Sequence, residues 1–180
     1  PFSSDSEDRW SSTVAVAKEL GLEVRPELVV QLDRDLTSPE LGYPVVQQLL
    51  ASHQSFTALL SFNDMAAIGA IRALQDAGLR VPQDVSVVGF DDIKGAAFNN
   101  PSLTTIRQPL EEMGRTAARI ALSRVQGKHE FEDEIAIEPE LVIRESSGSA
   151  AEGGQEQNIA EEKAGAHSRR SAARSGSEAG

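Results

Sequence analysis

Two pairs of polar residues stand directly after apolar runs of strand length, and their types suit the binding of a small molecule. Asn63 and Asp64 follow the apolar run 56–62, and Asp91 and Asp92 follow the next run of this kind. A carboxylate accepts strong hydrogen bonds from hydroxyl groups or ring nitrogens, and an amide side chain both donates and accepts. The two pairs therefore indicate a site for a polar ligand with several hydrogen-bond donors.

The residues around these pairs predict the elements that position them. Strands are predicted over 56–62 and 85–90, with a helix between them that stops at Gly78. The apolar residues at helical spacing are Met65, Ile68, Ile71 and Leu74. A strand, a helix and a second strand in this length form a βαβ unit, whose parallel strands end at the same edge of the sheet. Ligands bind at that edge in open α/β folds, so all four polar residues are expected there.

Several motifs in this stretch resemble, in order and spacing, the effector-binding core of the LacI/GalR (lactose/galactose repressor) family of bacterial transcription regulators. They are Phe62-Asn63-Asp64-Met65-Ala66, Gly78-Leu79-Arg80-Val81-Pro82, the run from Asp84 to Asp92, and the run from Leu103 to Pro109. The resemblance spans residues 1–147. It implies an α/β fold of periplasmic-binding-protein-like type I, with a parallel sheet covered by helices on both faces. The chain would hold mostly the C-terminal lobe of that fold.

The resemblance also implies a function. The chain would be the ligand-sensing part of a DNA-binding transcriptional regulator, usually a repressor, with no enzymatic activity and no cofactor. A small metabolite, most often a sugar or a nucleobase-like compound, would bind between two lobes of a cytoplasmic homodimer and change its affinity for operator DNA. A helix-turn-helix headpiece is absent from this sequence, so the chain is expected to be a piece of a longer protein.

The resemblance assigns effector contacts to Asp91, Asn63, Arg9 and Gln108. Asp91 has an alternative role as a turn residue that satisfies backbone amides, and Arg9 as a solvated helix residue. Asn63 offers both a hydrogen-bond donor and an acceptor, which favours its assignment as a ligand contact. The helix-capping alternative for the Asn63-Asp64 pair also stays open, and Asp92 is expected to be a local cap.

Further positions carry weaker assignments. Asp64 is a possible effector contact or a helix cap. Leu36 stands in a loop where relatives often carry an aromatic residue that packs on the ligand, and this loop contains no aromatic side chain. Met65, Ile68 and Ile71 belong to the core or to a dimer interface.

Four regions are expected along the chain. Residues 1–109 form the C-terminal lobe of the effector-binding domain, and 110–127 form a crossover helix that packs in the N-terminal lobe. Residues 128–147 return to the C-terminal lobe, and 148–180 form a disordered low-complexity tail. A helix is predicted from Glu7 to Leu20, capped by Asp5 or Ser6, with Trp10, Val14, Ala17 and Leu20 buried. A second helix is predicted from Ser38 to Ser52, and Pro44 is expected to kink it or to delay its start. Further strands are predicted over 28–32, 103–107, 135–137 and 141–143.

Composition narrows the choice of function. The net charge is −11, which disfavours contact between this part and the DNA backbone. There are no cysteines, the three histidines lie far apart in the sequence, and no apolar run is long enough to span a membrane. Two rival functions remain: a sugar- or solute-binding protein of a transport system, which shares the fold, and an enzyme that uses Asp91 or Asp64.

Overall fold

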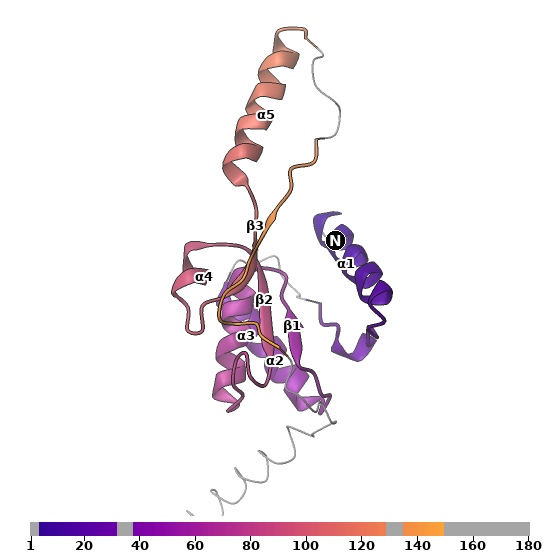
Figure 1. Cartoon of the computed structure of the whole chain (residues 1–180), viewed down its shortest axis with the longest axis vertical. Coiled ribbons are helices and arrows are strands. Elements are labelled where there is room, and N and C mark those ends of the chain that lie inside the picture. Colours follow the sequence, from indigo (N-terminus) through magenta and orange to yellow (C-terminus); the bar gives the residue numbers. More distant parts are fainter. Residues whose placement is uncertain (1–3, 32–37, 129–134, 150–180) are drawn as a thin grey trace, which may run out of the picture.

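The computed structural model describes residues 4–31, 38–128 and 135–149 (Figure 1). A four-stranded sheet forms its centre, with strand order β1-β2-β3-β4. The elements are α1 (Ser4–Glu19), η1 (Pro26–Leu28), η2 (Pro39–Leu41), α2 (Gly42–Ala51), β1 (Ala58–Leu60), α3 (Asp64–Asp76), β2 (Ser86–Asp91), α4 (Lys94–Phe98), β3 (Thr104–Arg107), α5 (Leu110–Val125) and β4 (Glu140–Val142).

The first three strands of the sheet are parallel, which confirms the predicted α/β class. Leu60 pairs with Val88, and Val88 pairs in turn with Thr104. The last strand, β4, runs antiparallel to β3, with Glu140 opposite Arg107. The predicted strand over 56–62 is confirmed in a shorter form, and the carboxyl ends of β1, β2 and β3 share one edge.

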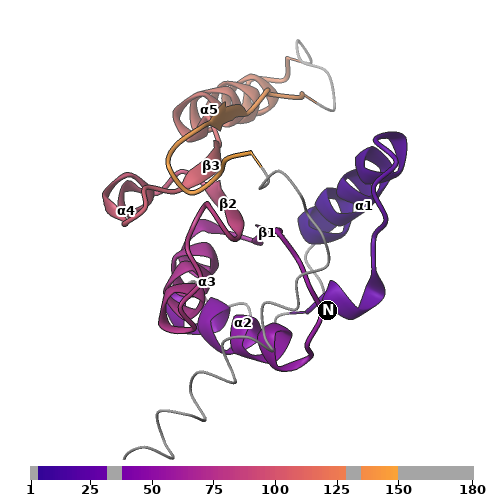
Figure 2. The same cartoon turned by 60° about the horizontal axis from the view of Figure 1, so that its bottom comes forward.

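The hydrophobic core lies between β2 and the two helices α2 and α3 (Figure 2). Ile71 and Leu74 of α3 are buried, as the helical spacing predicts, and Ile68 packs against them. Two glycines let the helices meet closely. A Cβ atom on Gly69 would lie 1.9 Å from the Pro39 carbonyl oxygen, and one on Gly42 would lie 1.8 Å from the Ala66 oxygen.

The start of α2 agrees with its sequence signals. The Ser38 side chain accepts a hydrogen bond from the Glu40 amide at 3.3 Å and caps the short turn η2. The helix α2 begins at Gly42, so Pro44 falls in its first turn, where its missing N–H removes no helical bond. The delayed start predicted for this helix is confirmed, and Pro44 does not need to kink it.

The N-terminal helix α1 corrects two predictions. It begins at Ser4, so Asp5 and Ser6 lie inside the helix and not at its N-cap position. Its apolar face is not buried: Trp10 is 44% exposed and Leu20 is 70% exposed. In Figures 1 and 2, α1 stands beside the sheet, apart from α2 and α3. A 3.6-residue period shows that a helix has an apolar face, but not what covers it.

The strand predicted over 28–32 is also wrong where the structure describes it. Pro26 begins the turn η1, and the Val29 amide bonds back to the Pro26 carbonyl oxygen. Proline fixes φ near the helical value at the first position of such a turn, which favours η1 over a strand that starts at Leu28. Residues 29–31 have no regular structure, and residue 32 lies outside the described residues.

The helix α5 leaves the sheet after β3 and extends away from the core (Figure 1). It ends before Gly127, whose φ of +72° confirms the predicted stop. Its apolar residues are largely exposed: Leu110 (62%), Met113 (41%), Leu122 (59%) and Val125 (85%). After the undescribed segment 129–134 the chain returns as β4, which confirms the return strand over 141–143. Residues 135–137 form no strand, and 150–180 lie outside the described residues.

Candidate functional site

The carboxyl ends of the three parallel strands bring the predicted site residues to one edge of the sheet. Asn63 and Asp64 follow β1, Asp91 ends β2, and Gln108 follows β3. Parallel pairing in register, with Asp91 opposite Arg107, places these ends beside one another. The shared edge predicted from the βαβ pattern is therefore confirmed, and Gln108 joins it.

Asp91 and Gln108 are in direct contact. The Gln108 Nε2 group donates a hydrogen bond to Asp91 Oδ1 at 2.6 Å, and both side chains are half-buried. The φ angle of Asp91 is +115°, a conformation that residues with a side chain rarely adopt. Unusual backbone angles of this kind concentrate at functional sites, where surrounding contacts maintain them. The contact also shows that the amide group of Gln108 reaches the Asp91 carboxylate.

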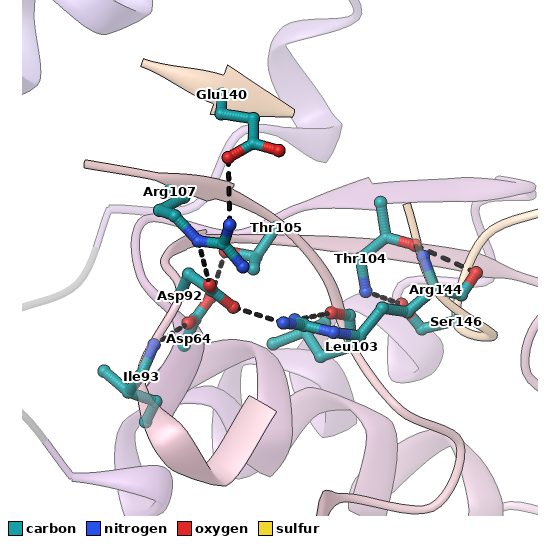
Figure 3. A network of polar contacts seen from close by, with 10 residues as sticks. All are labelled: Asp64, Asp92, Ile93, Leu103, Thr104, Thr105, Arg107, Glu140, Arg144 and Ser146. Carbon is teal, nitrogen blue, oxygen red and sulfur yellow. Dashed lines mark hydrogen bonds and ion pairs between the residues drawn. The ribbon is translucent and has the colours of Figure 1, made fainter. Parts of the chain in front are cut away.

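Asp92 is not a helix cap, which corrects the prediction for this residue. Its carboxylate binds two arginines: Arg107 Nε lies 2.6 Å from Oδ2, and an Arg144 terminal nitrogen lies 2.5 Å from Oδ1 (Figure 3). The helix α4 takes its N-cap from Ile93, without a side-chain hydrogen bond. Burial by itself raises the pKa of Asp92, but hydrogen bonds from Arg144 and Arg107 outweigh burial and hold the pKa below its ordinary value of 3.8.

The arginines extend this contact into a network between strands, which we call the Asp92 network: Asp92, Arg107, Glu140 and Arg144. Arg107, at the end of β3, also pairs with Glu140 of β4 at 2.9 Å. Arg144 donates a second bond to the Leu103 carbonyl oxygen at 2.7 Å. The Asp92 network thus fastens the end of β2 to the place where the chain leaves for α5 and to the place where it returns (Figure 3).

The structure separates the roles of Asn63 and Asp64. Asn63 Oδ1 accepts a hydrogen bond from the Ala66 amide at 2.8 Å, so Asn63 caps α3. Asp64 is fully buried: Oδ1 accepts from the Thr105 hydroxyl at 2.5 Å and Oδ2 accepts from the Ile93 amide at 2.8 Å (Figure 3). The capping alternative is therefore right for Asn63 and wrong for Asp64. A buried Asp64 is also out of reach of a ligand in this conformation.

The charge of Asp64 is not favoured by its surroundings. Burial raises the pKa of its carboxyl group above the ordinary value, although the hydrogen bonds from Thr105 and Ile93 lower it. The nearby carboxylates of Asp91 and Asp92 add to the rise. The two hydrogen bonds that Asp64 accepts therefore matter more for its place in the structure than its negative charge does.

Arg9 reaches the same edge from α1. Its guanidinium group lies 4.5 Å from the ring centre of Phe62 and 4.2 Å from that of Phe90, and it donates a hydrogen bond to the Phe62 carbonyl oxygen at 3.0 Å. Arg9 is therefore more than a solvated helix residue. The two phenylalanines were missed in the sequence because each ends an apolar run and reads as core. Their position directly before Asn63 and Asp91 was the available signal.

The remaining predicted positions are less informative. Leu36 lies outside the described residues. Ile71 is a core residue, while Met65 and Ile68 are only partly buried, and Ile68 packs on the core. A shallow hollow adjoins the Asp91–Gln108 contact at the start of α5 and is lined by Gln108, Pro109, Leu110, Glu111, Glu112 and Arg115. Among the described residues, no cluster of potential ligands could hold a metal ion.

Comparison with known protein families identifies the domain. Residues 3–147 match the periplasmic binding protein-like domain. The chain belongs to this domain family. The periplasmic-binding-protein-like fold expected from the sequence is therefore confirmed, with β4 as an antiparallel strand at the edge of its sheet.

Individual relatives of this domain are transcription regulators. The chain is 43% identical over 138 residues to a protein of Erwinia tasmaniensis named HTH-type transcriptional repressor PurR, and 42% identical to one of the same name from Yersinia pestis. Each match covers 77% of this chain and 40% of the relative. The chain thus spans less than half the length of these relatives. The resemblance to LacI/GalR regulators is confirmed.

Solved structures give the same result. A sugar-binding transcriptional regulator of the LacI family from Escherichia coli, in complex with phosphate, aligns with a TM-score of 0.72 and 30% identity over 80% of this chain and 50% of its own. A complex of the regulator CelR with cellobiose aligns with a TM-score of 0.67 and 32% identity, over 73% of this chain and 39% of the other. In the described ranges, no helix of this domain is long and apolar enough to cross a membrane.

The Asp92 network makes a pH-dependent contribution to stability. Because the pKa of Asp92 is lowered in the folded state, its ion pairs stabilise the fold above pH ~3.8, and this stabilisation is lost as the pH falls through the folded-state pKa. We expect Asp92→Asn to lower the free energy of unfolding by about 2 kcal/mol at pH 7. The difference from wild type should shrink as the pH falls below ~3.8. Urea denaturation at several pH values measures it.

A matched control is Glu111→Gln, which removes an exposed ion pair with Arg115 on α5. Exposed pairs of this kind contribute little, so this variant should unfold like wild type at every pH. If the deficit of Asp92→Asn stays constant down to pH 2, Asp92 is not stabilised as an anion by Arg107 and Arg144.

Proposed function

We propose that this chain is the ligand-sensing part of a DNA-binding transcriptional regulator that acts as a repressor. The observation that carries the proposal is the 43% identity to a named transcriptional repressor across 138 residues, which include the whole strand-end site. The ligand is a small metabolite, most simply a sugar, since a carboxylate and two amide side chains at this edge suit a compound rich in hydroxyl groups. Asp91 is the principal contact, with Arg9 and Gln108 beside it.

The other half of the binding cleft is supplied by a part of the protein outside this chain. The exposed apolar residues of α5 support this arrangement, because a helix that leaves its own core needs another surface to cover Leu110, Met113 and Val125. We assign that surface to the N-terminal lobe. Operator DNA is bound by a headpiece outside this chain, because a net charge of −11 disfavours DNA contact here. The intact regulator is a cytoplasmic homodimer without enzymatic activity.

The rival functions have less support. The relatives described above are regulators, and none is named as a transport protein. An acid/base pair would need two carboxyl groups aimed at one substrate. Asp92 is instead held by two arginines and Asp64 is buried, which leaves Asp91 alone at the surface of the site.

The proposal is tested with the intact protein encoded by the complete gene. Its affinity for DNA upstream of that gene is measured by fluorescence anisotropy, with and without a panel of mono- and disaccharides and nucleobases. We expect tight binding by the intact protein, none by this chain alone, and a change of about tenfold or more with one metabolite, which corresponds to a coupling free energy of about 1.4 kcal/mol. A secretory signal on the intact protein, or indifference to DNA, would support the transport function instead.

A further inference from the structure

The end of β2 has a backbone conformation that needs external support. Asp91 has a φ angle of +115° and Asp92 one of +54°, and both are residues with a side chain. Such a conformation is unfavourable for a residue with a side chain and persists only where surrounding contacts determine it. The Asp92 network holds Asp92 through its ion pairs with Arg107 and Arg144.

The first backbone donor after this segment belongs to Ile93, and Asp64 accepts it. The bond from the Ile93 amide to Asp64 Oδ2 measures 2.8 Å. The other oxygen of the same carboxylate accepts the Thr105 hydroxyl, whose residue lies in β3 opposite Gly89 of β2. Asp64 therefore ties the turn after Asp92 to the neighbouring strand through one fully buried side chain.

A glycine in the middle of β2 makes room for this carboxylate. A Cβ atom on Gly89 would lie 2.3 Å from Asp64 Oδ1 and 2.9 Å from Leu103 Cδ2. Glycine weakens a strand interior and often marks a point where another group approaches closely. Here the approaching group is Asp64, so the strand carries an unfavourable residue at the position where the carboxylate enters the sheet.

We propose that Asp64 is the positioning residue of the site: it never touches the ligand, and it holds Asp91 in its binding conformation through Ile93 and Thr105. The inference rests on the proposed function in one respect, that Asp91 contacts the effector. The two hydrogen bonds themselves exist without any ligand. They can therefore be tested in the intact protein without ligand.

A matched set of substitutions follows from the hydrogen bonds. Asp64→Ala removes both acceptors. Asp64→Asn can keep both contacts, because its amide oxygen accepts from Ile93 and its NH₂ group donates to the Thr105 hydroxyl, which both donates and accepts. Gly89→Ala displaces the carboxylate while leaving Asp64 in the sequence. Ile71→Val removes one methylene group from the core and controls for a general loss of stability.

The experiment is NMR of the intact protein without ligand, at a temperature where each variant is folded. Two signals are followed: hydrogen exchange of the Ile93 amide, and the side-chain amide resonances of Gln108, which report its bond to Asp91. We expect Asp64→Ala and Gly89→Ala to speed Ile93 exchange roughly tenfold, the loss of about one net hydrogen bond, and to shift the Gln108 resonances. Asp64→Asn and Ile71→Val should leave both signals close to wild type.

Two outcomes would overturn the proposal. In the first, Asp64→Ala leaves the Gln108 resonances unchanged, so that Asp64 supports only the fold. In the second, Ile71→Val shifts them as much as Asp64→Ala does, so that the signals follow stability and not position. Failure of the proposed function would look different, because the NMR results would be as expected while the intact protein responds to no metabolite in the panel.

Discussion

Replacing Asp91 by asparagine in the intact regulator is expected to weaken effector binding by about two orders of magnitude. Hydrogen bonds to a charged group contribute about 1.5–3 kcal/mol each, and the loss of two such bonds to ligand hydroxyl groups corresponds to roughly a hundredfold or more. The asparagine keeps the shape of the side chain and an oxygen that can accept the Gln108 bond seen at 2.6 Å. The thermal midpoint of the free protein should therefore change little.

A second substitution at this position separates binding from folding. Asp91→Gly removes the carboxylate and also the backbone strain, because glycine accepts a φ angle of +115° without a Cβ clash. We expect this variant to be at least as stable as wild type and to bind no effector. Titration calorimetry and thermal melting measure the two properties, and Glu40→Gln, an exposed carboxylate of η2, is the control. Effector binding by Asp91→Gly at wild-type affinity would show that Asp91 is a turn residue only.

Replacing Gly69 by alanine is expected to destabilise the fold strongly, with a loss of about 3 kcal/mol or more. The added Cβ would lie 1.9 Å from the Pro39 carbonyl oxygen and 3.2 Å from the Tyr43 nitrogen. Both are backbone atoms, so no side chain can move aside, and η2 and α2 must separate from α3. Because α3 begins at Asp64, this separation should disturb the site as well as the core. Urea denaturation followed by circular dichroism measures the loss.

The matching control is Gly114→Ala in α5. A Cβ atom there meets nothing within 4 Å, and the residue lies inside a helix. Alanine in a helix interior is favoured over glycine by about 0.5–1 kcal/mol, so this variant should be slightly more stable than wild type. Equal unfolding midpoints for Gly69→Ala and wild type would mean that the close crossing of these helices does not form.

Local signals in the sequence predict the central part of the fold correctly. The βαβ unit from β1 to β2, the strand β3 and the helix α5 each follow from apolar spacing and a stop residue, and each is confirmed. The predictions that fail concern what lies against an element. The period of Trp10 and Leu20 identifies α1 as a helix, but its burial depends on a partner surface. The strand predicted over 28–32 fails over its described residues, 28–31, because Pro26 favours a local turn over a distant pairing.

In the site, too, the positions of residues were predictable from the sequence but their partners were not. Periodicity placed Asn63, Asp64, Asp91 and Asp92 at one edge of the sheet, because strand ends can be located from sequence. It could not assign their partners, since Arg107, Arg144 and Thr105 are 15 to 52 residues away from the carboxylates they bind. Which of Asn63 and Asp64 caps α3 depends on which of the two adjacent side chains faces the sheet. The one local sign of this in the sequence is Gly89, which leaves room for the Asp64 carboxylate.

The pairing of Arg107 with Glu140 also has a consequence for protein engineering. These residues face each other as antiparallel neighbours, so the two ends of the segment between them lie side by side. Within the described residues, every member of the hydrophobic core cluster lies between Tyr43 and Leu103. A two-residue hairpin turn such as Asn-Gly could close the gap. The lobe could then be shortened to a minimal folded module that lacks Gln108 and α5, in which the segment between Arg107 and Glu140 is replaced by a linker of chosen length or by another domain.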